Sequence, residues 1–243
     1  MHRLKRWIFP SGSVQNMRDL GGYACDGGMT KYGVILRSDQ LHGMTEEEKL
    51  MLKQRGLTDV IDLRSEGERN DFVNDFAGDA DVLVHTISLD YNKDAMQFSP
   101  SDFTNMGQMY CKMADANARQ YTDMVRVAAR AKGLCVVHCM AGKDRTGIIC
   151  ALILLALGVD EADVVANYQI SETHNLRNKK LCAIFDGAPE TLHYLSYSTP
   201  ENMNLFIAHL GSNYGSAVDY LKQNGLTDDD LLALASRMVE PAE

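Results

Sequence analysis

The chain has 243 residues, of which 45% are hydrophobic and 23% charged, as is typical of a folded globular protein and not of a disordered or fibrous one. Its 24 basic and 33 acidic residues give a net charge of −9. That balance argues against nucleic acid or an anionic membrane surface as a partner attracted by overall charge. A local cationic pocket, or a small basic patch at Arg3, Lys5 and Arg6, is compatible with it.

The six cysteines form neither a paired framework nor a CxxC motif, so we expect reduced thiols in a reducing compartment, by default the cytoplasm. The apolar stretch near the start of the chain stops at Pro10 and is too short for a signal peptide. The longest apolar run, residues 148–157, is shorter than the roughly 18 residues that a spanning helix needs. We therefore expect no stable membrane insertion, while export without a recognisable signal peptide stays open.

Four short β-branched runs predict strands, at residues 34–36, 59–63, 82–89 and 134–138. Thr45, followed by three glutamates, predicts a capped helix that ends at Gly56. Apolar residues at spacings of three and four between Phe103 and Ala128 predict one long amphipathic helix ending near Gly133. We interpret its methionine and tyrosine side chains as core rather than as the lining of a ligand groove.

Another apolar helix is predicted over residues 146–157, closed by Gly158, and Asp160 opens the next. Residues 201–243 contain three helical patterns with Gly211, Gly215 and Gly225 between them. Alternation of strands and helices predicts an α/β fold, with a central, mostly parallel sheet flanked by helices and a helical C-terminal segment. We expect one domain over residues 1–243.

The chemically informative stretch is residues 136–147, which read Val-Val-His-Cys-Met-Ala-Gly-Lys-Asp-Arg-Thr-Gly. A strand ends at His138, a short loop follows, and a helix begins near Thr146. Five residues separate Cys139 from Arg145, so the loop can curl around one anion with its amide N–H groups inward, beside a helix N-terminus. The predicted phosphate-binding residues are Met140, Ala141, Gly142, Lys143, Asp144 and Arg145.

We expect Cys139 to be a thiolate, because neighbouring cations and the helix N-terminus stabilise the anion. Its attack on phosphorus would form a phosphocysteine that water then hydrolyses. Arg145 can bind two phosphate oxygens with its planar guanidinium. His138 is expected to orient the loop and support the thiolate, and the Thr146 hydroxyl to stabilise the thiolate as it departs. A buried cysteine beside a helix-capping arginine is the structural alternative; the coincidence of all these residues favours catalysis.

This loop resembles that of the cysteine-dependent protein tyrosine and dual-specificity phosphatases. Its residue pattern most resembles that of a microbial branch that acts on phosphotyrosine, other phosphoamino acids and phosphoinositides. Residues 16–22 (Asn-Met-Arg-Asp-Leu-Gly-Gly), 36–38, 60–65 and 214–228 also resemble that branch, so the likeness covers nearly the whole chain. It implies a tyrosine-phosphatase-like fold and a hydrolase that needs no cofactor. Because the histidines show no metal-ligand spacing, we also expect no metal site.

Two residues of the loop have more than one interpretation. Lys143 either contacts a substrate with several phosphates, as the likeness to phosphoinositide phosphatases implies, or only stabilises the thiolate. Asp144 is either turned away from the anion and structural, or protonated and a donor to the leaving oxygen. The resemblance implies that an aspartate in this position matters for activity.

The leaving oxygen needs a proton donor, and the Trp-Pro-Asp loop of eukaryotic tyrosine phosphatases is missing from the sequence. Asp90 follows the predicted strand 82–89 at the position where the superfamily usually places this acid. Asp94 and Asp102 are weaker candidates, and Asp102 is also a good helix N-cap. Solvated turn residues are the alternative for all three.

Further residues have open roles. Arg18, Asp19 and Arg64 either hold the phosphate loop or substrate, or serve in turns and salt bridges. In the related bacterial enzymes, a segment such as residues 168–210 of this chain can form a helical lid over the site. The apolar side chains in this segment would either line the underside of such a lid or belong to the ordinary core; they are Phe185, Leu192, Tyr194, Leu195 and Tyr197.

The sequence therefore predicts hydrolysis of phosphate monoesters, with protein phosphotyrosine as the main substrate and a broad specificity. The alternatives are a phosphoinositide phosphatase and a catalytically weak module that binds phosphorylated ligands. A sulfur- or arsenate-handling thiol enzyme is disfavoured, because Cys135 cannot easily reach Cys139 as a resolving partner. Oligomeric state is not predicted.

Overall fold

The structure is a computed structural model of the chain. It describes residues 12–87, 89, 103–178 and 197–242. Its central sheet has the strand order β1-β4-β7-β5-β6. Strands β4, β7, β5 and β6 are parallel and β1 pairs antiparallel with β4, which confirms the predicted, mostly parallel sheet. The bounds are β1 Arg18–Asp19, β4 Ile35–Ser38, β5 Leu57–Asp62, β6 Leu83–Thr86 and β7 Leu134–His138.

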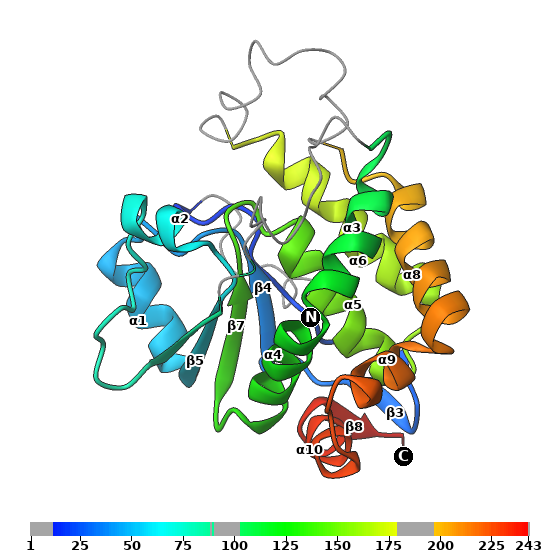
Figure 1. The fold of residues 1–243 in the computed structure, drawn as a ribbon. Helices are drawn as coiled ribbons and strands as arrows, with labels where there is room; N and C mark the ends of the chain where they lie inside the picture. The colour runs from blue at the N-terminus through cyan, green and yellow to red at the C-terminus, as the bar shows by residue number, and fades with distance from the viewer. Residues whose placement is uncertain (1–11, 88, 90–102, 179–196, 243) are drawn as a thin grey trace.

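Helices cover both faces of this sheet (Figure 1). On one side lie α1 (Glu46–Gln54) and α2 (Glu66–Asp71). The other side carries α3 (Met106–Ala116), α4 (Ala118–Arg130), α5 (Asp144–Ala156), α6 (Glu161–Asn175), α8 (Pro200–Tyr214), α9 (Ala217–Gln223) and α10 (Asp228–Met238). The sheet has a hydrophobic core on each face, and alternate residues of β7 point into them. Leu134 and Val136 pack in the core on the α1 side, and Cys135 and Val137 pack in the core on the other side. Burial on both faces explains the unbroken apolar run of this strand.

Local signals set most helix ends as expected. Thr45 and Glu48 form a reciprocal capping box at the start of α1. Asp160 caps α6, and α5 begins at Asp144, two residues before the predicted start. The methionine and tyrosine stripe lies in the main core cluster, which confirms its interpretation as core.

The predicted single helix between Phe103 and Gly133 is wrong. The segment forms two helices, α3 and α4, which meet at Asn117. The side-chain amide of Asn117 donates to the carbonyl of Met113 at 3.0 Å, and its main-chain N–H donates to the same carbonyl. An asparagine that bonds the backbone in this way competes with helix continuation, although the apolar spacing runs through it undisturbed.

A second sheet was not predicted. It contains β2 (Ala24–Cys25), β3 (Gly28–Thr30) and β8 (Val239–Pro241), in the order β2-β3-β8. A Cβ on Gly28 would lie 2.0 Å from the carbonyl oxygen of Glu240, so only glycine lets these strands approach. In the preceding helical segment, Gly211 lies inside α8 rather than between helices, whereas Gly215 and Gly225 follow α8 and α9.

The parallel register brings the loops that follow β4 and β7 to one edge of the sheet, with Ser38 opposite His138. In open α/β sheets this carboxyl edge is where ligands bind. Over the described residues, no helix combines the length and the apolar character needed to pass through a bilayer.

Candidate active site

Cys139 directly follows β7, and only 2% of its surface is exposed. Residues 139–145, here called the phosphate loop, connect β7 to α5. Three carbonyls of this loop accept hydrogen bonds from the segment around β1 and β4. The Met140 carbonyl accepts from the N–H of Gln40 (3.1 Å), that of Ala141 from Asn16 Nδ2 (2.9 Å) and that of Gly142 from Arg37 Nη2 (2.8 Å).

These bonds fix the direction of the loop amides. In a trans peptide the carbonyl and the next N–H point in opposite directions. With the carbonyls of residues 140–142 held from outside, the N–H groups of residues 141–143 point the other way, toward the inside of the loop. Converging N–H groups at a helix N-terminus bind anions, so the loop has the form expected of an anion site.

Gly142 makes the tight turn of the loop possible. Its φ is +66°, and a Cβ at this position would lie 2.5 Å from the carbonyl oxygen of Ser38 and 2.6 Å from the nitrogen of Asp39. Both the left-handed backbone and the close approach require glycine. The loop therefore packs directly on the chain that leaves β4.

Arg145 is held by a carboxylate that the sequence analysis did not identify. Its Nη1 and Nη2 donate to the two oxygens of Glu68 at 2.6 and 2.7 Å, and Nη1 also donates to the carbonyl of Leu63 at 3.1 Å. Burial alone would raise the pKa of Glu68, but the bonds and charge of Arg145 lower it. Glu68 also accepts the N–H of Ser65 in a capping box at the start of α2. That Ser-x-x-Glu pattern was the only local signal for it.

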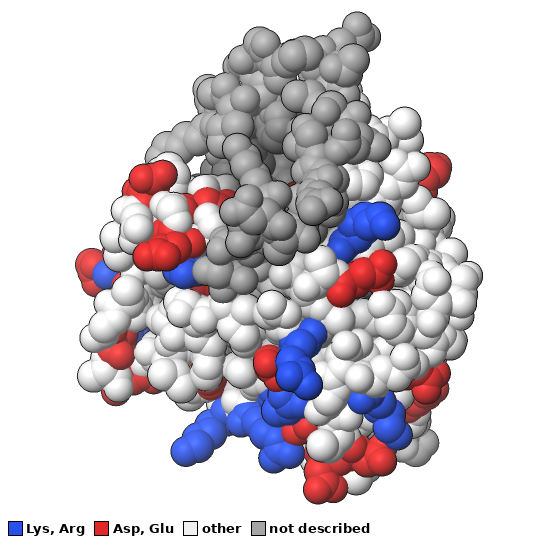
Figure 2. All heavy atoms as spheres, viewed as in Figure 1, with Lys and Arg blue, Asp and Glu red and all other residues white. Residues whose placement is uncertain are grey.

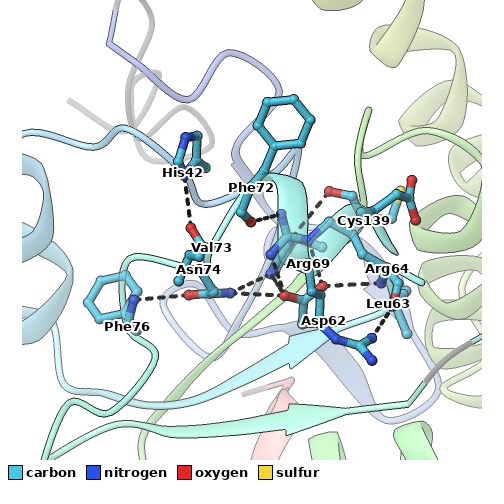
Figure 3. Close-up of polar contacts among 12 residues, drawn as sticks. His42, Asp62, Leu63, Arg64, Arg69, Phe72, Val73, Asn74, Phe76 and Cys139 are labelled. Atoms are coloured by element: carbon cyan, nitrogen blue, oxygen red, sulfur yellow. Dashed lines mark hydrogen bonds and ion pairs between the residues drawn. The ribbon is translucent and has the colours of Figure 1, made fainter. Parts of the chain in front are cut away.

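Behind the loop, His138 belongs to a buried polar cluster. Its Nε2 lies 2.9 Å from Asn74 Nδ2 and 3.4 Å from Asp62 Oδ2, and its Nδ1 lies 3.2 Å from the carbonyl of Cys139. Figure 3 shows Cys139 at the side of this cluster, in which Asp62, Arg64 and Asn74 converge. His138 thus contacts the main chain of the loop.

Arg64 takes the salt-bridge role. Its Nε and Nη2 donate to the two oxygens of Asp62 at 2.9 and 2.6 Å, and its Nη1 donates to the carbonyl of Phe72 (Figure 3). Both side chains of the pair are completely buried. Burial alone would raise the pKa of Asp62, but His138 and Arg64 hold it well below its usual range.

Asp144, the first residue of α5, accepts a hydrogen bond from the Tyr110 hydroxyl at 2.5 Å. The Tyr110 hydroxyl also bonds that of Tyr168 at 2.7 Å, and Asn202 Nδ2 donates to Tyr168 at 3.5 Å. Burial first, and then the charge of Asp144, raise the pKa of both tyrosines, which keeps them protonated donors. The chain of bonds links α8, α6, α3 and α5 and orients the carboxylate.

Lys143 and Thr146 are buried. The ammonium of Lys143 lies 3.2 Å from the carbonyl of Tyr197 and 3.4 Å from Asp144 Oδ1. The hydroxyl of Thr146 makes no hydrogen bond within the described part of the chain. The predicted role of this hydroxyl, which is to stabilise the departing thiolate, stays a prediction.

Arg18 and Asp19 are also buried. Arg18 donates to the carbonyl and side-chain oxygens of Asn16, the residue that holds the loop. The carboxylate of Asp19 accepts the N–H groups of Gly21 and Gly33 and stabilises turns instead. The candidate acids Asp90, Asp94 and Asp102 lie outside the described residues, as do residues 179–196 of the expected lid.

Metal ligands do not gather anywhere in the described ranges: no group of three or more His, Cys, Asp or Glu side chains there could hold an ion. On the face shown in Figure 2, basic and acidic side chains are interspersed, with the basic ones gathered at the lower end, where α4 and α10 lie in Figure 1. Arg126 and Arg130 of α4 both pair with Asp230 of α10.

The chain is similar in sequence to known proteins. The sequence model of the tyrosine phosphatase family matches residues 9–240. A tyrosine-protein phosphatase of Nostoc commune is 27% identical over 239 residues, which cover 88% of this chain and 77% of that protein. The triple specificity protein phosphatase PtpB of Mycobacterium tuberculosis is 30% identical over 183 residues, covering 63% and 65%. The crystal structure of P. aeruginosa TpbA covers 75% of this chain and 90% of its own, with 16% identity and a TM-score of 0.34.

Proposed function

Because the chain belongs to the tyrosine phosphatase family, we propose that it hydrolyses protein phosphotyrosine through a phosphocysteine at Cys139. The observation that carries the proposal is the outward anchoring of three loop carbonyls between Cys139 and Arg145. It directs the loop amides at the space in front of the sulfur, where an anion would be held.

In the first step the Cys139 thiolate attacks phosphorus, and the bond between phosphorus and the tyrosine oxygen breaks. The loop amides and Arg145 bind the phosphoryl oxygens, whose charge is spread in the transition state. A carboxylic acid donates its proton to the leaving phenolate, which makes the departure easier. The products are the dephosphorylated tyrosine side chain and the phosphocysteine.

In the second step water attacks the phosphocysteine and gives one proton to the carboxylate. The phosphorus–sulfur bond breaks, and inorganic phosphate leaves. His138 positions the loop, and the Thr146 hydroxyl donates a hydrogen bond to the sulfur as it departs as a thiolate. We assign the proton-transfer role to Asp144 or Asp90. The bond from Tyr110 to Asp144 supports an organising role for that carboxylate, since it commits one of its oxygens.

We propose broad specificity, with phosphotyrosine preferred and phosphoserine or phosphothreonine also accepted. The relative named triple specificity protein phosphatase PtpB supports this breadth. The contacts of Lys143 with Tyr197 and Asp144 support a role inside the protein over direct contact with a polyphosphorylated inositol. We also propose a reducing compartment such as the cytoplasm. The free thiols of Cys25, Cys111, Cys135, Cys139 and Cys150 support it.

The test measures turnover of a phosphotyrosine peptide, a phosphoserine peptide and a phosphoinositide in vesicles, side by side and without added metal. Cys139→Ser is the blank. We expect the fastest turnover with the tyrosine peptide and a loss of at least about 1,000-fold in the variant, which still binds inorganic phosphate. Rapid quenching should trap phosphate on Cys139 of the wild type.

Other results of this test would indicate a different function or mechanism. Preference for the vesicles would make the protein a phosphoinositide phosphatase and Lys143 a substrate contact. Binding of the peptides without any turnover would indicate a module that only captures phosphorylated ligands. Undiminished activity of Cys139→Ser would remove the covalent mechanism.

A further inference from the structure

Two buried arginines lie behind the phosphate loop. Arg18 of β1 and Arg37 of β4 are direct partners across the antiparallel strand pair, with exposures of 0% and 1%. Among the described residues, neither guanidinium lies within ion-pair distance of a carboxylate. Buried charges in proteins are usually paired, so this pair of cations needs a physical explanation.

Neutral groups bind the terminal nitrogens of these guanidinium groups instead, while the buried Nε of each arginine has no hydrogen-bond partner among the described residues. Arg37 Nη1 donates to Asn167 Oδ1 at 2.5 Å, and Arg18 Nη2 donates to the carbonyl of Asn167 at 2.6 Å. Both arginines also reach the hydroxyl of Ser171, at 2.9 Å from Arg18 and 3.3 Å from Arg37. Helix α6 therefore fixes both side chains without cancelling their charge.

Only Arg37 contacts the phosphate loop directly. Its Nη2 donates to the carbonyl of Gly142 at 2.8 Å, and the same carbonyl accepts from Asn16 Nδ2 at 3.2 Å. That peptide unit carries the N–H of Lys143, which the outward carbonyl turns toward the anion. Arg18 acts one step further back, because it holds the oxygen atoms of Asn16.

The two cations also repel each other. Burial and then the charge of Arg37 lower the pKa of Arg18, and the charge of the buried Asp39 opposes this shift only in part. An anion inside the phosphate loop offsets this repulsion, whether it is a thiolate or a bound phosphate. Charges act over longer distances in a protein interior than in water, because screening is weaker there.

We propose that Arg37 is a positioning residue of the phosphate loop: it directs the amide of Lys143 at the bound anion and supplies unpaired positive charge behind it. Arg18 supports this arrangement through Asn16. The inference rests on the proposed function, since it concerns the same site. It extends that function by naming a residue that touches neither the substrate nor the sulfur.

The experiment needs no turnover. It measures the affinity for inorganic phosphate, and the rates at which iodoacetate and iodoacetamide alkylate Cys139, followed on the Cys139 peptide by mass spectrometry. The first reagent is an anion and the second is neutral, so the ratio of their rates reports the local potential. A change in packing alone would alter both rates together.

Three variants separate the two effects. Arg37→Met should lower the iodoacetate to iodoacetamide ratio and the phosphate affinity, each roughly tenfold. Arg37→Lys keeps the charge, so the ratio should stay within about twofold while the phosphate affinity falls. Arg237→Met is the matched control: Arg237 also donates to main-chain carbonyls, those of Ala131, Val34 and Gly133, but lies near β8, away from the loop. It should change neither quantity.

The inference is overturned if Arg37→Met matches Arg237→Met in both measurements, or if Arg37→Lys binds phosphate as tightly as wild type. Should Arg37→Met fail to fold, the phosphate affinity of Arg37→Lys decides alone. Failure of the proposed function would look different: wild type would bind phosphate and prefer iodoacetate, yet hydrolyse no phosphotyrosine.

Discussion

Glu68 accepts hydrogen bonds from both terminal nitrogens of Arg145, at 2.6 and 2.7 Å. The bidentate geometry fixes the plane of the guanidinium as well as its position. Because Glu68 is itself anchored by the N–H of Ser65, the start of α2 determines where Arg145 can bind an anion. The helix cap and the phosphate site thus share one carboxylate.

Replacing Glu68 by Gln tests this link. Glutamine still serves the capping box, so α2 should keep its start while the charged partner of Arg145 is lost. A hydrogen bond to a charged group contributes about 1.5–3 kcal/mol, so we expect kcat/KM for a phosphotyrosine peptide to fall by roughly 10- to 100-fold. Glu66→Gln is the control, because Glu66 is exposed on the same helix turn. Equal kinetics of the two variants would contradict the link.

Gly142→Ala probes the contact between the phosphate loop and the end of β4. A left-handed backbone alone costs a non-glycine residue about 1–2 kcal/mol, and here the new Cβ would also lie 2.5 Å from the Ser38 oxygen. Gly78 has a similar φ of +78° with nothing within 4 Å of its Cβ position. Gly78→Ala should therefore lose only stability, measured by urea denaturation. Gly142→Ala should also lose up to about 100-fold in kcat, and normal turnover would refute the crowding argument.

Tyr110→Phe tests whether the tyrosine chain organises Asp144. Loss of the hydroxyl that bonds Asp144 should lower kcat roughly tenfold, with little further loss when it is added to Asp144→Asn. A double-mutant cycle on kcat measures this coupling. Tyr220→Phe removes another buried hydroxyl, which donates to the carbonyl of Ala114, and should affect stability alone. Additive losses for Tyr110 and Asp144 would show that the bond between them is irrelevant to turnover.

The Asp62–Arg64 pair predicts a pH dependence of stability. The pKa of Asp62 is lower in the folded protein than in the unfolded chain, so its stabilisation is complete above the unfolded value and is lost as pH falls below about 4. Asp62→Asn should lower the free energy of unfolding at pH 7 by about 3–5 kcal/mol, because it leaves Arg64 buried without its partner.

Urea denaturation at pH 7 and pH 3 checks both parts. The difference between the two pH values should be smaller for Asp62→Asn than for wild type. Asp71→Asn, which removes an exposed carboxylate at the end of α2, controls for the loss of one charge. A wild-type pH dependence in Asp62→Asn would mean that other groups govern acid unfolding.

Strands and helices were predicted correctly from the sequence where the residues that determine them lie close together in the chain. The unbroken apolar run of β7 and the capping box of Thr45 and Glu48 each lie within a few residues, and the structure has both. The break at Asn117 escaped prediction, because the apolar spacing continues through it and only the side-chain bond to Met113 reveals it.

The supporting contacts of the site could not be predicted in the same way. Glu68 lies 77 positions from Arg145 in sequence, Arg37 lies 105 from Gly142, and Asn16 lies 125 from Ala141. Such pairs are brought together by the sheet and not by any spacing along the chain. Pairing of β7 with β5 and β4 brings Glu68 and Arg37 to the loop, and pairing of β1 with β4 brings in Asn16. Arg37 and Asn16 stood inside stretches that resembled the family, but their roles followed only from the geometry.

The pairing of β8 with β3 has a consequence for synthesis. Gly28 lies opposite Pro241, so the β2–β3 hairpin leaves the ribosome long before the strand that covers its edge. Unpaired strand edges invite association with other chains. A nascent chain stalled before residue 239 would present that open edge to its neighbours until β8 pairs with β3.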